Sequence, residues 1–217
     1  MPRSHIDHIA VTAPSLQSGA EFVHSQLGVM PLPGGEHPRM GTHNLLLRLG
    51  ESVYLEVIAI KPDTAAPGRP RWFGLDTLTV GTPPRLATWI ARSSDILASA
   101  AASSEVLGQV EPMSRGALNW KITVPQDGAL VLGGIAPALI GWEPGTHPAT
   151  RMQDLGLALI GLELFHPEPE RITALLHSLD MHGPVSVSAL AAGATPYLVA
   201  HIDTPQGPRR LSGCQRF

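Results

Sequence analysis

The feature that most constrains the fold is a strand–helix–strands pattern that occurs three times along the chain. At its first occurrence, an alternating segment over 5–12 predicts a strand, a periodic segment over 15–28 predicts a helix, and further strands follow up to Ile60. The same order begins again at Leu86 and, in a shorter form, at Leu157. One such unit cannot cover its own sheet face, so we expect the units to pack against one another.

This pattern predicts the α+β class, built from repeated βαβββ modules. We divide the chain into a first module at 1–62, a proline-rich connector at 63–84, a second module at 85–145 and a third, shorter βαβ-type module at 153–217. We expect the first two modules to form the pair that bears a pocket. The third module then packs on this pair, or pairs across a homodimer, because its sheet face also needs cover.

Composition argues against two classes of partner. The net charge is -3 and the chain has no basic block, so we expect it to bind neither a nucleic acid nor an acidic membrane surface. The longest apolar run, at 129–142, is interrupted by glycines and a proline and is too short to cross a bilayer. The single cysteine, Cys214, allows no disulfide framework and has no catalytic setting that we can identify. We expect a cytoplasmic protein without a targeting segment.

One carboxylate interrupts an apolar strand of the first module. Leu55 and Val57 share one face of this strand, so Glu56 lies on the other face and is presented to whatever that face encloses. Alternation on the preceding strand places Asn44 and Arg48 on the same side as Glu56. For Arg48, a solvated position at the edge of the sheet is an equal alternative.

A strand–helix–strands unit with His8 on its first strand and Glu56 on its last resembles the vicinal-oxygen-chelate superfamily, which includes glyoxalase I, extradiol dioxygenases and the fosfomycin and bleomycin resistance proteins. The motifs of this chain look more specifically like those of the glyoxalase-like group. They are Gly34-Gly35-x-His37-Pro38-x-Met40-Gly41-Thr42-x-Asn44, Tyr54-Leu55-Glu56, Pro112-Met113-Ser114-Arg115-Gly116, Leu118-Asn119-Trp120, Leu139-Ile140-x-Trp142 and His147-Pro148-Ala149. The resemblance covers nearly the whole chain and implies curled mixed sheets around a cavity, with the helices outside.

The resemblance also implies a metal site, because the first-strand His and the last-strand Glu of the superfamily are metal ligands. Those positions are His8 and Glu56 here, and Zn, Ni, Fe, Mn or Mg would suit such donors. The equivalent positions of the other two modules are occupied by Thr88, Ile140, Gly161 and Leu211. The chain therefore supplies two ligands where three or four are usual. A general acid/base pair, or a structural His–Glu hydrogen bond, is the alternative for His8 and Glu56.

Six further residues are candidates for substrate contact: Asn44, His43, Arg48, Arg92, Arg115 and Trp120. An Arg beside aromatic side chains can hold a carboxylate or phosphate together with the apolar part of a small molecule. The alternatives are a surface Arg over an aromatic core in the second module, and a His43 that only organises its loop.

Two functions fit these residues. The first is an enzyme that acts on a small oxygen-rich molecule, as a lyase, an isomerase or a dioxygenase, with Glu56 and His8 as its catalytic groups. The second is a protein that binds a drug or metabolite without turnover, as the resistance proteins of the superfamily do. A third interpretation is a structural or regulatory relic whose cavity is filled. The missing ligands favour the last two interpretations, whereas the retained pair favours the enzyme, which we prefer. The chain has no glycine-rich phosphate loop, so we expect no nucleotide cofactor.

Overall fold

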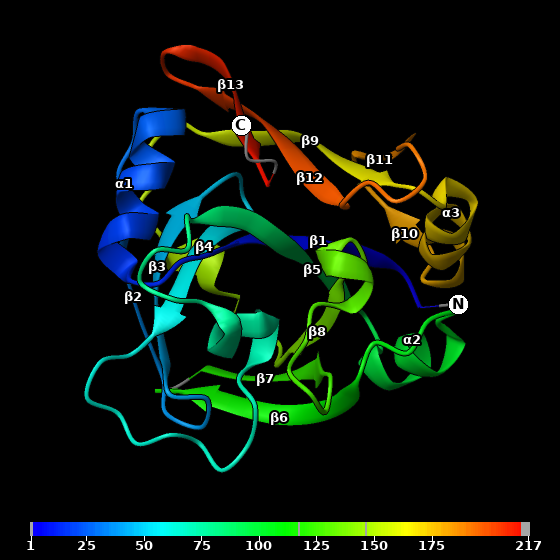
Figure 1. Ribbon diagram of the computed structural model, residues 1–217, viewed down its shortest axis with the longest axis horizontal. Coiled ribbons are helices and arrows are strands. Elements are labelled where there is room, and N and C mark those ends of the chain that lie inside the picture. Colours follow the sequence, from blue (N-terminus) through cyan, green and yellow to red (C-terminus); the bar gives the residue numbers. More distant parts are fainter. Residues whose placement is uncertain (1, 117, 146, 214–217) are drawn as a thin grey trace.

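The computed structural model describes residues 2–116, 118–145 and 147–213 of the chain. They form one large curved sheet and a second, four-stranded sheet that lies across one side of it (Figure 1). Cys214, with the last residues of the third module, lies outside the described residues. Among the described residues, no helix has the length and apolar character needed to cross a membrane.

The large sheet has the strand order β2-β3-β4-β1-β5-β8-β7-β6, with β10 paired to β1. Its strands are β1 (Ser4–Thr12), β2 (Leu32–His37), β3 (Thr42–Arg48), β4 (Tyr54–Ile60), β5 (Arg85–Ser93), β6 (Gln109–Arg115), β7 (Leu118–Val124), β8 (Ala138–Trp142) and β10 (Met181–His182). The second sheet has the order β11-β9-β12-β13. Its strands are β9 (Ala158–His166), β11 (Val185–Ala189), β12 (Tyr197–Thr204) and β13 (Gly207–Ser212).

The described residues also form three α-helices and three short 3-10 helices: α1 (Leu16–Leu27), α2 (Ile96–Ala102), α3 (Pro169–Ser178), η1 (Trp72–Thr77), η2 (Val131–Gly134) and η3 (Pro148–Arg151). The order β1-α1-β2-β3-β4 recurs as β5-α2-β6-β7-β8, and the two halves join where β1 and β5 pair antiparallel. The α+β class with a curled sheet is therefore confirmed. Helix α1 begins and ends as its sequence indicates, with Ser15 accepting the Ser18 N–H and Gly28 in the left-handed conformation.

The large sheet separates two apolar clusters. On its outer face, Leu55 and Val57 of β4 lie in one cluster with Val23 and Leu27 of α1. The same cluster contains Leu86, Trp89, Leu162, Leu164 and Leu198, so β5 and the second sheet share this core. The inner face carries the second cluster, which includes Ile58 of β4. The second sheet therefore packs on the outer face of the large sheet, and the inner face is left to enclose a site.

A β-bulge in β1 changes which side chains face inward. Ile6 pairs with Ala91 of β5 and His8 pairs with its neighbour Ile90, so Asp7 is an extra residue on β1. Ile6 and Ile9 both lie in the outer cluster although they are three positions apart, which strict alternation forbids. The bulge therefore turns Asp7 and His8 to the same, inner side of the sheet.

A matched pair of substitutions tests the outer core. The Trp89 indole N–H donates to the Ile135 carbonyl at 2.8 Å, whereas the equally buried Trp72 N–H has no hydrogen-bond partner among the described residues. Trp89→Phe orphans a buried carbonyl, and Trp72→Phe does not. We expect Trp89→Phe to lower the free energy of unfolding by about 1–3 kcal/mol more than Trp72→Phe does in urea denaturation. Equal losses would show that the Trp89 hydrogen bond does not stabilise the fold.

Candidate active site

A small cavity lies on the inner face of the large sheet, enclosed by strands of both halves and by η1. Its volume is about 30 Å³, which is room for about two water-sized groups. Its polar lining consists of His8, His37, Asn44, Tyr54, Glu56 and Arg115. Buried ionisable groups around an enclosed space are the usual mark of a functional site, so this cavity is the candidate site.

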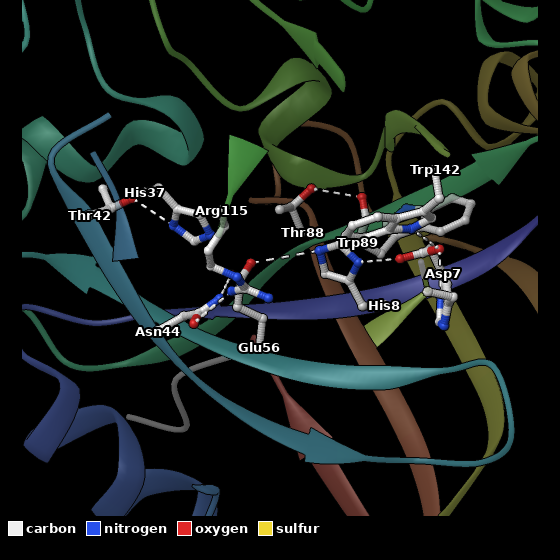
Figure 2. Close-up of polar contacts among 11 residues, drawn as sticks. Asp7, His8, His37, Thr42, Asn44, Glu56, Thr88, Trp89, Arg115 and Trp142 are labelled. Atoms are coloured by element: carbon white, nitrogen blue, oxygen red, sulfur yellow. Dashed lines mark hydrogen bonds and ion pairs between the residues drawn. The ribbon is translucent and has the colours of Figure 1, made fainter. Parts of the chain in front are cut away.

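Two carboxylates flank the His8 imidazole (Figure 2). Asp7 Oδ1 accepts a hydrogen bond from His8 Nδ1 at 2.7 Å, and Glu56 Oε2 lies 3.7 Å from His8 Nε2, within ion-pair range. Burial would lower the pKa of His8, but Asp7 and Glu56 outweigh burial and raise it to about 9. Burial would raise the pKa of Glu56, but His8, helped by Asn44, lowers it to about 2. At neutral pH the cavity therefore holds an imidazolium beside a carboxylate.

Asn44 fixes the orientation of Glu56. Its Oδ1 accepts hydrogen bonds from the Gly35 N–H at 2.8 Å and from Arg115 at 3.2 Å, so its Nδ2 must point the other way and donates to Glu56 Oε1 at 2.5 Å. Asn44 stands on β3, directly beside β4, whereas Arg115 reaches in from β6. The second half of the sheet thus contributes to holding the carboxylate of the first half.

Asp7 is a fully buried carboxylate that gathers donors from distant segments. Its Oδ2 accepts from Trp142 Nε1 on β8 at 3.0 Å and from His147 Nε2 at 3.0 Å. The His147 Nδ1 accepts the Ala149 N–H, so the proton of that ring is on Nε2 and is donated to Asp7. Burial opposes ionisation, but the hydrogen bonds from His147 and His8 outweigh it and hold the pKa of Asp7 well below its usual range. Asp7 therefore ties the segment after β8 to the site.

Aromatic rings form the remaining walls. Tyr54 stacks on His8 with ring centroids 4.4 Å apart, and Trp72 meets His37 edge-on at 5.1 Å. Burial, reinforced by the charges of Asp7 and Glu56, raises the pKa of Tyr54 well above its usual range, so its phenol stays protonated. Burial lowers the pKa of His37 to about 4, so this ring is neutral at pH 7. The cavity thus combines one charged and one neutral imidazole.

The structure brings some of the predicted site residues together and leaves others outside. Asn44, Arg115 and Trp120 line the cavity with His8 and Glu56.

Three predicted residues do not line it. His43 alternates with Asn44 and faces the other side of β3, whereas Arg48 lies at the end of β3, where it bonds the Gly50 carbonyl at 2.9 Å. Arg92 lies outside the cavity, and its Nη1 is 3.7 Å from Asp7 Oδ2.

Sequence reasoning missed the contributions of Asp7, Trp72 and Phe73. Asp7 was hidden by the bulge, because strict alternation turns it away from His8. Trp72 and Phe73 come from η1, which lies in the segment taken as a proline-rich connector. The sequence signal that could have indicated them is that two adjacent aromatic residues stand within that connector.

The side chains near His8 and Glu56 decide whether the predicted divalent metal could be held there. Among the described residues, no group of three or more His, Cys, Asp or Glu side chains is placed to hold an ion. His8 and Glu56 face the cavity, but Ile140 lines it at the position equivalent to Glu56 and supplies no ligand. Two ligands hold a divalent ion weakly. These residues do not fit a divalent ion held by this chain alone.

Comparison with known proteins places this fold in a family. The model of the glyoxalase-like domain matches residues 6–179, and the chain belongs to that family. The predicted membership in the vicinal-oxygen-chelate superfamily is thereby confirmed. No match was found among curated protein sequences.

Solved structures share the fold at low sequence identity. A hypothetical protein from Staphylococcus aureus has a TM-score of 0.58 at 14% identity, over 96% of this chain and 84% of that one. A mutant of 4-hydroxymandelate synthase from Streptomyces coelicolor has a TM-score of 0.50 at 17% identity, over 98% of this chain and 63% of that one. Methylmalonyl-CoA epimerase from Mycobacterium tuberculosis has a TM-score of 0.39 at 19% identity, over 64% and 87%. At these identities the first two likenesses show the fold alone.

The neutral His37 predicts a pH dependence of stability. Its pKa is lower in the folded chain than in the unfolded chain, so the unfolded chain binds more protons between about pH 6.5 and 4. His37 therefore stabilises the fold above pH 6.5, and this contribution is lost as the pH falls toward 4. We expect the wild type to lose roughly 2–3 kcal/mol more than His37→Asn between pH 7.5 and pH 4.5 in urea denaturation.

The control for this experiment is His24→Asn, which removes an exposed imidazole from α1. It should follow the wild type at every pH. If His37→Asn also followed the wild type, the ring would not be held neutral by burial.

Proposed function

We propose that this chain is an enzyme that moves a proton next to a carbonyl group in a small oxygen-rich molecule, as an isomerase or a lyase does. Glu56 is the general base, and the His8 imidazolium is the hydrogen-bond donor to the carbonyl oxygen. The observation that carries this proposal is a buried carboxylate and a buried imidazolium, 3.7 Å apart, that line the same small cavity.

The proton balance is simple. Glu56 removes the proton from the carbon next to the carbonyl, the electron pair of that C–H bond moves into a C=C bond, and the carbonyl oxygen becomes an enolate oxygen. The His8 Nε2–H stabilises that oxygen. Return of the proton to another position gives an isomer, and loss of a leaving group from the neighbouring carbon gives the product of a lyase.

The surroundings of Glu56 support its role as the base. In the ligand-free site, His8 and Asn44 stabilise the carboxylate and make it a weak base. A substrate oxygen that accepts the His8 hydrogen bond competes with Glu56 for that proton, which strengthens Glu56 as a base when a substrate is present. Asn44 and Arg115 keep the carboxylate aimed at the cavity.

Exchange of carbon-bound protons with solvent tests this function. Hydroxyacetone and other 1-hydroxy-2-alkanones in D₂O should lose the proton next to the carbonyl faster with the protein than without it, as followed by ¹H NMR. Glu56→Gln should slow this exchange at least 10²-fold, because the variant has no base.

Glu163→Gln is the matched control. Glu163 is a half-buried carboxylate on β9 that accepts a hydrogen bond from Ser188 at 2.8 Å, away from the cavity. This variant should keep the wild-type exchange rate. Equal exchange by wild type and Glu56→Gln would contradict the assignment of the base.

Binding without turnover is the second candidate function, favoured by the small aromatic-walled cavity and the incomplete ligand set. It predicts that the same ketones bind and do not exchange. A cytoplasmic location and a homodimer stay predictions from the sequence.

A further inference from the structure

The guanidinium of Arg115 lines the cavity without a carboxylate partner. Among the described residues, its side chain makes one hydrogen bond, from Nη1 to Asn44 Oδ1 at 3.2 Å, and no ion pair. A guanidinium has five N–H donors, so most of those of Arg115 are not used by these residues. Glu111, on the same strand β6, pairs instead with Arg39 and Arg69. Arg115 is therefore available to an anion that enters the cavity.

The charged side chains at the cavity have an excess of positive charge. His8 and Arg115 are the cations that line it at neutral pH, and Glu56 is the anion. Asp7 lies outside this lining, on the far side of His8, where Arg92 stands 3.7 Å from its Oδ2. Three cations thus face two carboxylates. An anionic group on the substrate would balance the excess, and burial makes such balance important.

Arg115 and Glu56 lie at opposite ends of one amide group (Figure 2). Asn44 donates to Glu56 through Nδ2 and accepts from Arg115 through Oδ1. The guanidinium and the proposed base are therefore separated by a single amide, and a molecule of a few carbon atoms can reach both. Arg115 is half-buried whereas His8 and Glu56 are buried, so the guanidinium is closer to solvent than the reacting groups are.

The backbone of β2 leaves room for the Arg115 side chain. Arg115 comes from β6, in the other half of the sheet, and passes Gly35 of β2 to reach Asn44. A Cβ at position 35 would stand 2.7 Å from Arg115 Cδ, which is closer than real Cβ atoms approach a neighbour. A larger residue than glycine would therefore displace the side chain. Close packing on Gly35 and the bond to Asn44 position the guanidinium before a ligand binds, which lowers the cost of binding.

We propose that Arg115 binds a carboxylate of the substrate, and that the substrate is a short 2-oxo acid. This inference rests on the proposed function for the position of the carbonyl group, between His8 and Glu56. In a 2-oxo acid the carbonyl separates the carboxylate from the carbon that loses its proton, as Asn44 separates Arg115 from Glu56. The planar guanidinium donates two parallel hydrogen bonds to the carboxylate, a geometry that the two groups share.

Two ligands that differ at one group test this carboxylate subsite. Hydroxypyruvate and hydroxyacetone share a hydroxymethyl ketone, and carry a carboxylate or a methyl group on the other side of the carbonyl. Their dissociation constants are measured at pH 7.5 by NMR chemical-shift titration of the whole chain. We expect the wild type to bind hydroxypyruvate about tenfold or more tightly than hydroxyacetone, because hydrogen bonds between charged groups are strong.

Variants of Arg115 should reduce this preference in a defined order. Arg115→Gln removes the charge and should lower the ratio of the two dissociation constants about tenfold or more. Arg115→Lys keeps the charge but loses the two parallel donors, so it should retain part of the preference. Urea denaturation shows whether each variant is folded, and Arg115→Lys provides the test if Arg115→Gln does not fold.

Arg39→Gln is the matched control. It also removes one arginine charge beside β6, where Arg39 donates to the Pro112 carbonyl, but Arg39 is exposed and lies outside the cavity. Solvent and salt screen such a charge, so this variant should keep the wild-type ratio within about twofold. The inference is overturned if the wild type binds the two ligands equally or binds neither. It is also overturned if Arg115→Gln and Arg115→Lys keep the ratio, or if Arg39→Gln lowers it as much as Arg115→Gln does.

The two proposals fail separately. Proton exchange in hydroxyacetone that depends on Glu56, without a preference for hydroxypyruvate, overturns the carboxylate subsite and leaves the enzyme. A preference for hydroxypyruvate that depends on Arg115, without exchange in either ligand, overturns the enzyme and leaves a site that binds oxo acids.

Discussion

The site depends on one buried row of alternating charges, in which the carboxylate of Asp7, the imidazolium of His8 and the carboxylate of Glu56 follow one another. Isolated charges are costly to bury, and each member of this row is stabilised by its neighbour. The row exists because the bulge in β1 turns both Asp7 and His8 inward. Asn44 completes one end of the row, and Trp142 with the segment after β8 completes the other.

The fold was readable from the sequence because its signals are local and periodic. Alternation in β4 placed Leu55 and Val57 on one face, which the structure packs on α1, and Glu56 on the opposite face. Ser15 and Gly28, the cap residues of α1, marked its ends. The repeated order of elements indicated that the modules pair. The position of the second sheet, by contrast, depends on a core shared by residues far apart in sequence, such as Leu86 and Leu198, and no local sequence pattern predicts such packing.

The site was readable in part, for a related reason. Alternation tells which face a residue occupies, so it placed Asn44 on the side of Glu56, and the two side chains are hydrogen-bonded. It does not tell how far along a strand the cavity extends, and Arg48 on the same face lies beyond it. Asp7 escaped prediction because a bulge breaks the alternation on which the prediction depends.

The protonation state of His8 tests the buried row of alternating charges most directly. Two-bond ¹H–¹⁵N correlation spectra, with His8 assigned by its loss in His8→Gln, report how many ring nitrogens carry a proton. We predict that both nitrogens of His8 are protonated at pH 7.5 and that the ring loses a proton only near pH 9. A ring that is neutral at pH 7.5 would contradict the row of alternating charges and the role of His8 as a donor to substrate.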